Sequence, residues 1–286
     1  MHVPVMLAEA LEYLAVRPDG VYADVTAGLG GHTGAIAARL TSGTVIALDR
    51  DAESLERTRE NTTAWSGRIR YRQAAFSGLG QALEELGIGR IDGLLADLGV
   101  SRYQLTEPER GFSLASSGPL DMRMDRSQAL TAAEIVNTLS ERELADLIFQ
   151  LGEEGRSRQI ARAIVRARPL RDTLHLAHVI EGAVPRTGRL DPATKTFMAL
   201  RRAVNREKEE LDALLETAPG LLASGGRMVV ITFMSLEDRQ VKEAFRNLAR
   251  RPGVRLLTKH VVKPGREEIE SNPPSRSAKL RAVEMG

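Results

Sequence analysis

Cysteine is absent from this 286-residue sequence, aromatic residues make up only 4% of it, and no apolar run approaches the roughly 20 residues that cross a bilayer. Without cysteine the chain forms no disulfide, holds no zinc through thiolates and uses no thiol nucleophile. The start, Met1-His2-Val3-Pro4, lacks the basic and then apolar pattern of a secretory signal. We therefore expect a cytoplasmic protein with no membrane segment and no metal site.

The net charge of +2 conceals an uneven distribution of charge along the chain. Residues 1–100 contain 9 Arg and Lys against 13 Asp and Glu, a balance of −4. Residues 150–208 contain 13 against 6, a balance of +7. This basic segment suggests a polyanionic substrate. The alternative is a solvated helical surface whose charges pair four residues apart.

The segment from Val21 to Asp51 carries the clearest functional signal. A β-rich run ending at Asp24 leads into Gly28-Leu29-Gly30-Gly31, then into a helical stretch and a second β-branched run that ends at Asp49. Such a β–loop–α–β unit holds a nucleoside-bearing cofactor, and the acid after its second strand can bind ribose hydroxyls. The dinucleotide fingerprint requires a glycine where this chain has Thr33. This favours S-adenosylmethionine over a dinucleotide, while an ordinary glycine turn remains the alternative.

Alternating patterns predict an α/β fold with a doubly wound, Rossmann-like parallel sheet. Strands are expected near 21–25, 44–48, 69–74, 91–96, 227–233, 254–258 and 278–284, the last two suiting an antiparallel edge. Between 105 and 215 the signals are helical, including a capping box at Ser140 and Glu143. Asp191-Pro192 should open one long helix towards Leu215. We predict a methyltransferase-like core of residues 1–104 and 216–286 with an inserted all-helical domain, 105–215, that recognises the substrate.

Asp97 follows the fourth strand and therefore faces the same crevice as the glycine loop and Asp49. Methyltransferases that modify exocyclic amino groups place an acid or amide here, usually before two prolines, which this chain lacks. The sequence as a whole closely resembles the bacterial 16S ribosomal RNA (cytosine-N4)-methyltransferases, the MraW or RsmH family. The resemblance covers almost the whole chain and rests on segments that include His2-Val3-Pro4-Val5, Gly30-Gly31-His32, Asp49-Arg50-Asp51, Asp97-Leu98-Gly99-Val100-Ser101, Gly118-Pro119-Leu120-Asp121-Met122-Arg123-Met124 and Ser235-Leu236-Glu237-Asp238-Arg239.

The resemblance implies methyl transfer from S-adenosylmethionine to N4 of a cytidine in the decoding region of 16S ribosomal RNA, within the small ribosomal subunit, and it leaves room for a homodimer. Asp97 would be the catalytic residue, accepting a hydrogen bond from N4 during direct displacement. Asp49 would hold the ribose and Phe76 would pack on the adenine. The implied cofactor-binding residues are Gly30, Gly31, His32, Asp49, Phe76, Asp97 and Gln104.

Four residues depart from the family pattern: Arg102-Tyr103 replaces Ser-Pro, Met198 replaces a common Gln, and Met234 replaces His. Met234 removes any obligatory histidine base there. The target base must leave its stack, and Tyr103 or Phe112 is a candidate to stack on it. Arg110, Arg123 and the arginines of 156–171 are candidates for phosphate contacts. A nicotinamide-dependent enzyme, a non-catalytic assembly factor and a methyltransferase with another acceptor remain the competing hypotheses.

Overall fold

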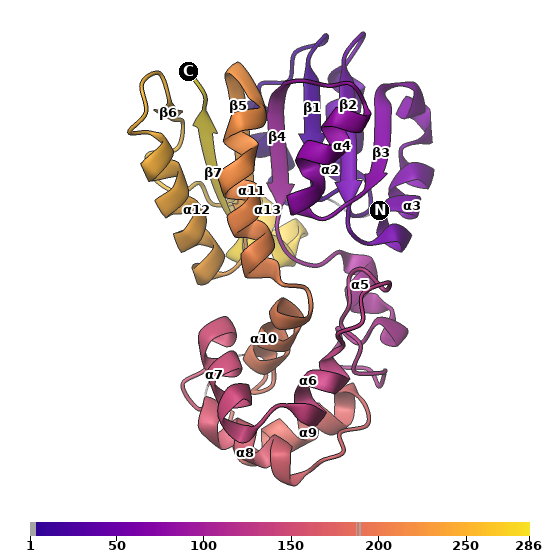
Figure 1. Ribbon diagram of the computed structural model, residues 1–286, viewed down its shortest axis with the longest axis vertical. Coiled ribbons are helices and arrows are strands. Elements are labelled where there is room, and N and C mark those ends of the chain that lie inside the picture. The colour runs from indigo at the N-terminus through magenta and orange to yellow at the C-terminus, as the bar shows by residue number, and fades with distance from the viewer. Residues whose placement is uncertain (1–3, 187, 189) are drawn as a thin grey trace. The chain divides into compact units, whose positions relative to one another are not determined.

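The computed structural model describes residues 4–186, 188 and 190–286, so His2 and Val3 of the resemblance lie outside the described residues. The chain forms two compact units (Figure 1). The first comprises Met1–Ser101 and Glu209–Gly286, and the second comprises Arg102–Lys208. That the helical domain, predicted as 105–215, recognises the substrate remains a proposal.

The first unit is built on a seven-stranded sheet of order β3-β2-β1-β4-β5-β7-β6. The strands are β1 (Val21–Asp24), β2 (Thr44–Asp49), β3 (Ile69–Gln73), β4 (Ile91–Asp97), β5 (Leu222–Thr232), β6 (Arg255–Leu256) and β7 (Lys279–Glu284). Strands β1 to β5 pair in parallel, whereas β7 is antiparallel to both β5 and β6. The predicted doubly wound α/β sheet with an antiparallel edge is confirmed.

Helices cover both faces of this sheet, which explains why its central strands are nearly continuous apolar runs. Neighbouring residues of β2 point to opposite faces. Ile46 and Leu48 belong to the apolar core on the face that carries α4 (Leu79–Glu85), α11 (Glu207–Leu221) and α12 (Ser235–Leu248). Val45 and Ala47 belong to the apolar core on the opposite face, which carries α1 (Leu7–Leu14), α2 (Gly31–Arg39) and α3 (Ala52–Asn61). The remaining helix of this unit is α13 (Arg266–Ser271), with short 3-10 turns at Thr63–Arg68, Phe76–Gly78 and Pro273–Ser277.

The second unit is helical throughout its regular structure. Its helices are α5 (Arg102–Thr106), α6 (Ala132–Thr138), α7 (Glu141–Gly152), α8 (Ser157–Arg166), α9 (Thr173–Ala183) and α10 (Thr194–Val204), with a 3-10 turn at Pro108–Arg110. The predicted capping box is present at the start of α7, where Ser140 and Glu143 bond each other's backbone N–H groups. Helix α7 packs against both α8 and α10 and buries Leu144 and Ile148 between them.

The prediction of a single long helix after Asp191-Pro192 is wrong, because the structure has two helices there. Helix α10 begins at Thr194 and ends at Val204, and Asn205 and Arg206 separate it from α11, which begins at Glu207. Arg206 has a φ of +49°, which a continuing helix does not allow. The Asn205 side chain bonds the loop at Met122 and Met124 instead of facing solvent, so a tertiary contact ends the helix. Strand β5 likewise starts earlier than expected, at Leu222, because Ile91 pairs with Leu222 before a register shift.

Candidate functional site

Three aspartates end three adjacent parallel strands. Asp24 ends β1, Asp49 ends β2 and Asp97 ends β4, and these strands are neighbours in the order β2-β1-β4. Parallel strands bring their carboxyl ends to one edge of the sheet, and β1 is the strand where the order reverses. The sequence predicted Asp49 and Asp97 as site residues. It pointed to Asp24 only as the acid that ends the first strand.

The loop after β1 needs its glycines for two different reasons. Gly28 and Gly30 have φ values of +57° and +86°, in the region that favours glycine. A Cβ on Gly30 would lie 2.8 Å from Cγ2 of Thr62, and one on Gly31 would lie 2.8 Å from Cγ of Pro4. Gly30 and Gly31 are therefore required by contacts with the protein itself. At Gly28 the same atom would meet only the Thr26 carbonyl oxygen, at 3.7 Å.

Asp49 is oriented by two backbone N–H groups. Gly28 N donates to its Oδ2 at 2.8 Å, and Asp51 N donates to its Oδ1 at 2.9 Å. Each oxygen keeps acceptor capacity for a further donor, as two ribose hydroxyls would provide. Burial raises the pKa of Asp49 to about 7, against the lowering effect of the two N–H donors. The carboxyl therefore titrates near neutrality and is more easily held ionised once it accepts further hydrogen bonds.

Asp24 lies fully buried beneath the loop and accepts hydrogen bonds from two threonines. Thr33 Oγ1 donates to Oδ2 at 2.6 Å, while the N–H and hydroxyl of Thr26 donate to Oδ1 at 3.1 and 3.3 Å. Burial raises the pKa of Asp24, and the His32 charge and these hydrogen bonds oppose that rise. Thr33, the residue that breaks the dinucleotide fingerprint, thus supplies the hydroxyl that satisfies Asp24.

Asp97 has one carboxylate oxygen that the protein does not satisfy. Its backbone N–H donates to Thr26 Oγ1 at 2.7 Å, but its Oδ1 is buried and has no hydrogen-bond partner within the described part of the chain. Burial, and then the negative charges of Asp24 and Glu268, raise the pKa of Asp97 well above its ordinary value. A buried acceptor without a donor is costly, so this atom is expected to meet a donor from a ligand.

His32 lies against the other oxygen of Asp97. Its Nε2 is 3.1 Å from the Val5 carbonyl oxygen, which can only accept, so Nε2 carries the hydrogen. Its Nδ1 faces Oδ2 of Asp97 at 3.7 Å. The ring is buried at the start of α2. Glu268 of α13 completes this side, accepting the Met6 N–H at 2.6 Å, and no sequence signal had pointed to it.

The two remaining predicted cofactor residues lie in different units. Phe76 lies shortly after β3, in the 3-10 turn Phe76–Gly78, and is half-buried against the sheet core. Gln104 is a buried residue of α5 in the second unit. The structure thus assembles Gly30, Gly31, His32, Asp49, Phe76 and Asp97 in the first unit, while the role of Gln104 in cofactor binding stays a prediction.

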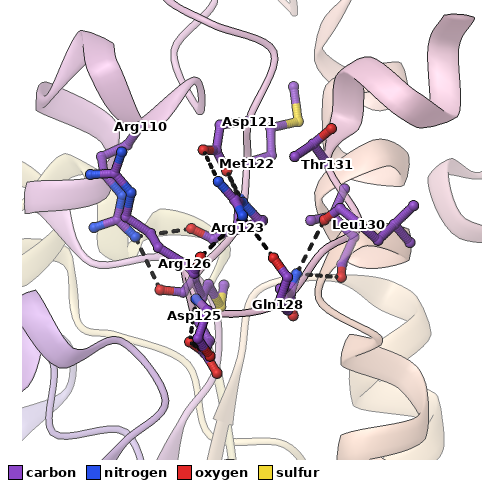
Figure 2. Close-up of polar contacts among 12 residues, drawn as sticks. Arg110, Asp121, Met122, Arg123, Asp125, Arg126, Gln128, Leu130 and Thr131 are labelled. Carbon is purple, nitrogen blue, oxygen red and sulfur yellow. Dashed lines mark hydrogen bonds and ion pairs between the residues drawn. The ribbon is translucent and has the colours of Figure 1, made fainter.

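The specific segment Gly118–Met124 forms a loop held by its own side chains (Figure 2). Arg123 forms an ion pair with Asp121 at 2.8 Å and donates to the backbone oxygens of Arg126 and Gln128. Arg110, only 2% exposed, donates to the backbone oxygens of Arg123 and Met124. Both guanidinium groups therefore organise this loop. Arg110 is buried, which argues against a phosphate contact there, whereas a phosphate contact of the partly exposed Arg123 stays a prediction.

The loop is also fixed from α10 and by aromatic rings. Asn205 accepts the Met124 N–H at 2.7 Å and donates to the Met122 oxygen at 2.7 Å. The Arg110 guanidinium lies 5.9 Å from the ring centres of both Tyr103 and Phe112. Phe112 is buried, which gives it a packing role within this unit, whereas Tyr103 is half-buried.

Comparison with known proteins places these features in a family. A model described as the MraW methylase family matches residues 1–286. The chain belongs to the MraW methylase family. A relative from Solibacter usitatus, named ribosomal RNA small subunit methyltransferase H, is 65% identical over 285 residues, covering 100% of both chains. A relative of the same name from Acidobacterium capsulatum is 49% identical, covering 99% of this chain and 98% of its own.

This MraW-family membership confirms the resemblance, and with it a methyltransferase that depends on S-adenosylmethionine. Among solved structures, the crystal structure of PH0851 aligns with 100% of this chain and 47% of its own, at 15% identity and a TM-score of 0.50. A likeness at that identity concerns the fold alone. No helix within the described residues is long and apolar enough to cross a membrane. Met234, which departs from the family pattern, is buried directly before α12.

Proposed function

We propose that this MraW-family protein methylates N4 of a cytidine in the decoding region of 16S ribosomal RNA, in the cytoplasm and on the small ribosomal subunit. The names of its relatives support ribosomal RNA as the substrate class. The observation that carries the chemistry is the buried Oδ1 of Asp97, which lacks a donor among the residues described. An exocyclic amino group offers the N–H that this oxygen requires.

The residues of the first unit fit the cofactor. S-adenosylmethionine supplies an electrophilic methyl group on a positively charged sulfur. Asp49 has an acceptor position left on each oxygen for ribose hydroxyls. Besides burial, the negative charges of Asp24 and Glu268 raise the free-energy cost of ionising Asp97. A cationic ligand offsets that repulsion and favours the ionised carboxyls.

Asp97 is assigned the role of orienting the attacking amine. The cytosine N4 lone pair is delocalised into the ring, so the amino group is a weak nucleophile. A hydrogen bond from N4 to Oδ1 of Asp97 fixes the direction of the amine and draws electron density onto nitrogen. After the methyl group has moved from sulfur to N4, N4 carries a positive charge until it loses one proton. The Asp97 carboxylate that accepts the hydrogen bond from N4 lies next to that proton. No covalent enzyme intermediate is required, which agrees with a chain that has no cysteine.

Asp97→Ala tests this assignment, because it removes the acceptor and leaves the fold of the strand end in place. We expect methyl transfer to unmodified small ribosomal subunits to fall by about 100-fold or more, in the range for a lost electrostatic contact in an active site. Circular dichroism and thermal unfolding check that the variant is folded. Full activity in a folded Asp97→Ala protein would refute the role. The homodimer stays a prediction, which sedimentation of the purified protein would check.

A further inference from the structure

A stretch of chain in the second unit concentrates arginine without any acidic residue. Residues 155–171 contain six arginines, no lysine and no Asp or Glu. They span α8, which packs between α7 and α9 in Figure 1. The nearest acids, Glu154 and Asp172, lie outside α8, so the arginines of this helix have no acidic partner four residues away within it, the pairing that usually explains charged helix surfaces. Ion pairs within α8 are therefore excluded as the explanation of its charge, and the only ion pair recorded for its arginines among the described residues joins Arg162 to Glu141 of α7.

The six arginines divide into two groups by their contacts. Arg156 donates to the Pro185 oxygen, and Arg168 donates to the oxygens of Val136 and Leu139, so both hold the fold. Arg158, Arg162, Arg166 and Arg171 are exposed. Arg162 lies 3.3 Å from Glu141 of α7. For the other three, the structure shows no guanidinium hydrogen bond or ion pair within the residues it describes.

Three of the exposed arginines lie on one face of α8. Positions 158, 162 and 166 follow each other at four-residue steps, which places them about 6 Å apart along the helix axis. The opposite face of α8 is apolar and buried through Ile160, Ala161 and Ile164. We call the exposed side, formed by Arg158, Arg162 and Arg166, the arginine face. Each of its guanidinium groups can bind a phosphate through two N–H donors.

We propose that the arginine face of α8 binds the sugar–phosphate backbone of the substrate RNA. This proposal rests on the proposed function and adds to it the surface that contacts RNA away from the reacting base. The face contains no large exposed apolar side chain, which a membrane-inserting helix or the centre of a protein interface would need. The arginine face is therefore suited to electrostatic contacts with phosphate groups. Such contacts position nucleic acid without reading its sequence.

The test compares two double variants that remove equal charge. Arg158→Gln with Arg166→Gln alters the arginine face, whereas Arg246→Gln with Arg250→Gln alters exposed arginines of the first unit, in and just after α12. Binding to unmodified small ribosomal subunits is measured by filter retention between 50 and about 300 mM KCl, the range in which phosphate contacts weaken. S-adenosylmethionine binding is measured by calorimetry as a folding control.

We expect the arginine-face variant to bind subunits about tenfold more weakly and its logarithmic salt slope to fall by about 1.4 to 1.8, the value for two lost phosphate contacts. Its KM for subunits should rise while kcat stays within about twofold of the unaltered enzyme's, since the variant leaves the reacting residues intact. The control variant should keep both the affinity and the slope. Equal affinities and slopes for both variants would overturn the proposal.

The outcomes also separate this proposal from its rivals and from the proposed function. If the arginine-face variant keeps its RNA affinity but loses binding to anionic phospholipid vesicles or to polyglutamate, the face serves a membrane or an acidic protein. If the unaltered protein methylates no RNA, yet the arginine-face variant binds subunits more weakly than the control variant, the proposed reaction is refuted and the proposal for the arginine face is supported. If methylation proceeds and neither variant changes binding, only the arginine face is refuted.

Discussion

The titration of Asp49 should make cofactor affinity depend on pH around neutrality. Burial raises the pKa of this carboxyl to about 7 in the ligand-free protein. Each of its oxygens already accepts one backbone N–H, from Gly28 or Asp51. Ribose hydroxyls can use the remaining acceptor positions fully only when the carboxyl is ionised. Lowering the pH through 7 must therefore weaken binding.

The magnitude follows from the fraction of the ionised form. With a pKa of about 7, roughly one eleventh of Asp49 is ionised at pH 6 and roughly ten elevenths at pH 8. A ligand that binds only the ionised form then binds about tenfold more weakly at pH 6, a difference of about 1.4 kcal/mol. S-adenosylhomocysteine is the suitable probe, because it retains the ribose but lacks the sulfonium charge that would also act on Asp97.

Calorimetric titrations at pH 6, 7 and 8 measure this dependence, with Asp49→Asn as the comparison. The amide cannot ionise, and its N–H₂ would face one of the two backbone donors, so affinity should fall by about 10- to 100-fold. The remaining affinity should vary little between pH 6 and 8. An unaltered protein whose affinity changes by less than twofold over this range would refute the reasoning, as would an Asp49→Asn variant that keeps the tenfold slope.

Three further predictions concern stability. Gly30→Ala should lower the free energy of unfolding, measured in urea, by about 2 kcal/mol, because φ is +86° and the new Cβ meets Thr62. Gly80→Ala in α4 is the control: its new Cβ would have no atom within 4 Å, so it should raise the free energy of unfolding by about 0.5–1 kcal/mol, and equal effects of the two changes would contradict this. Asn205→Ala should cost about 2–4 kcal/mol by leaving Met122 and Met124 backbone groups unpaired, and a change under 0.5 kcal/mol would contradict the loop's described role. Because the native Asp49 pKa lies above the unfolded value, its contribution to stability falls as pH rises from about 4 to about 7, so the melting temperature of the ligand-free unaltered protein should decrease over that range more than that of Asp49→Asn.

Periodicity and turn residues located most of the sheet correctly because both signals are local. The runs ending at Asp24, Asp49 and Asp97 became β1, β2 and β4, and the capping box at Ser140 begins α7 as expected. The break between α10 and α11 was missed because it depends on Asn205 bonding a loop more than 80 residues away in sequence, at Met122. A contact of that kind leaves no local pattern.

The candidate site shows the same contrast between local signals, which the sequence carries, and long-range contacts, which it does not. The placement of Asp49 and Asp97 could be predicted because parallel strands bring the acids that end them to one edge of the sheet, while the roles of both residues stay predictions. The placement of Glu268 could not, since it enters the site from α13 near the other end of the chain. The structural role of Arg110 and Arg123 could not be predicted, because a sequence does not show which groups a guanidinium contacts. The structure gives both of them backbone acceptors.

The proposed reaction is tested by labelled-methyl transfer to unmodified small ribosomal subunits, followed by mass spectrometry of the nucleosides of the RNA. We expect label in N4-methylated cytidine at one position, dependent on S-adenosylmethionine and lost in Asp97→Ala. Label in another nucleoside, or none at all in a protein that binds S-adenosylmethionine, would contradict it and direct attention to Arg102 and Tyr103, where this chain departs from its family.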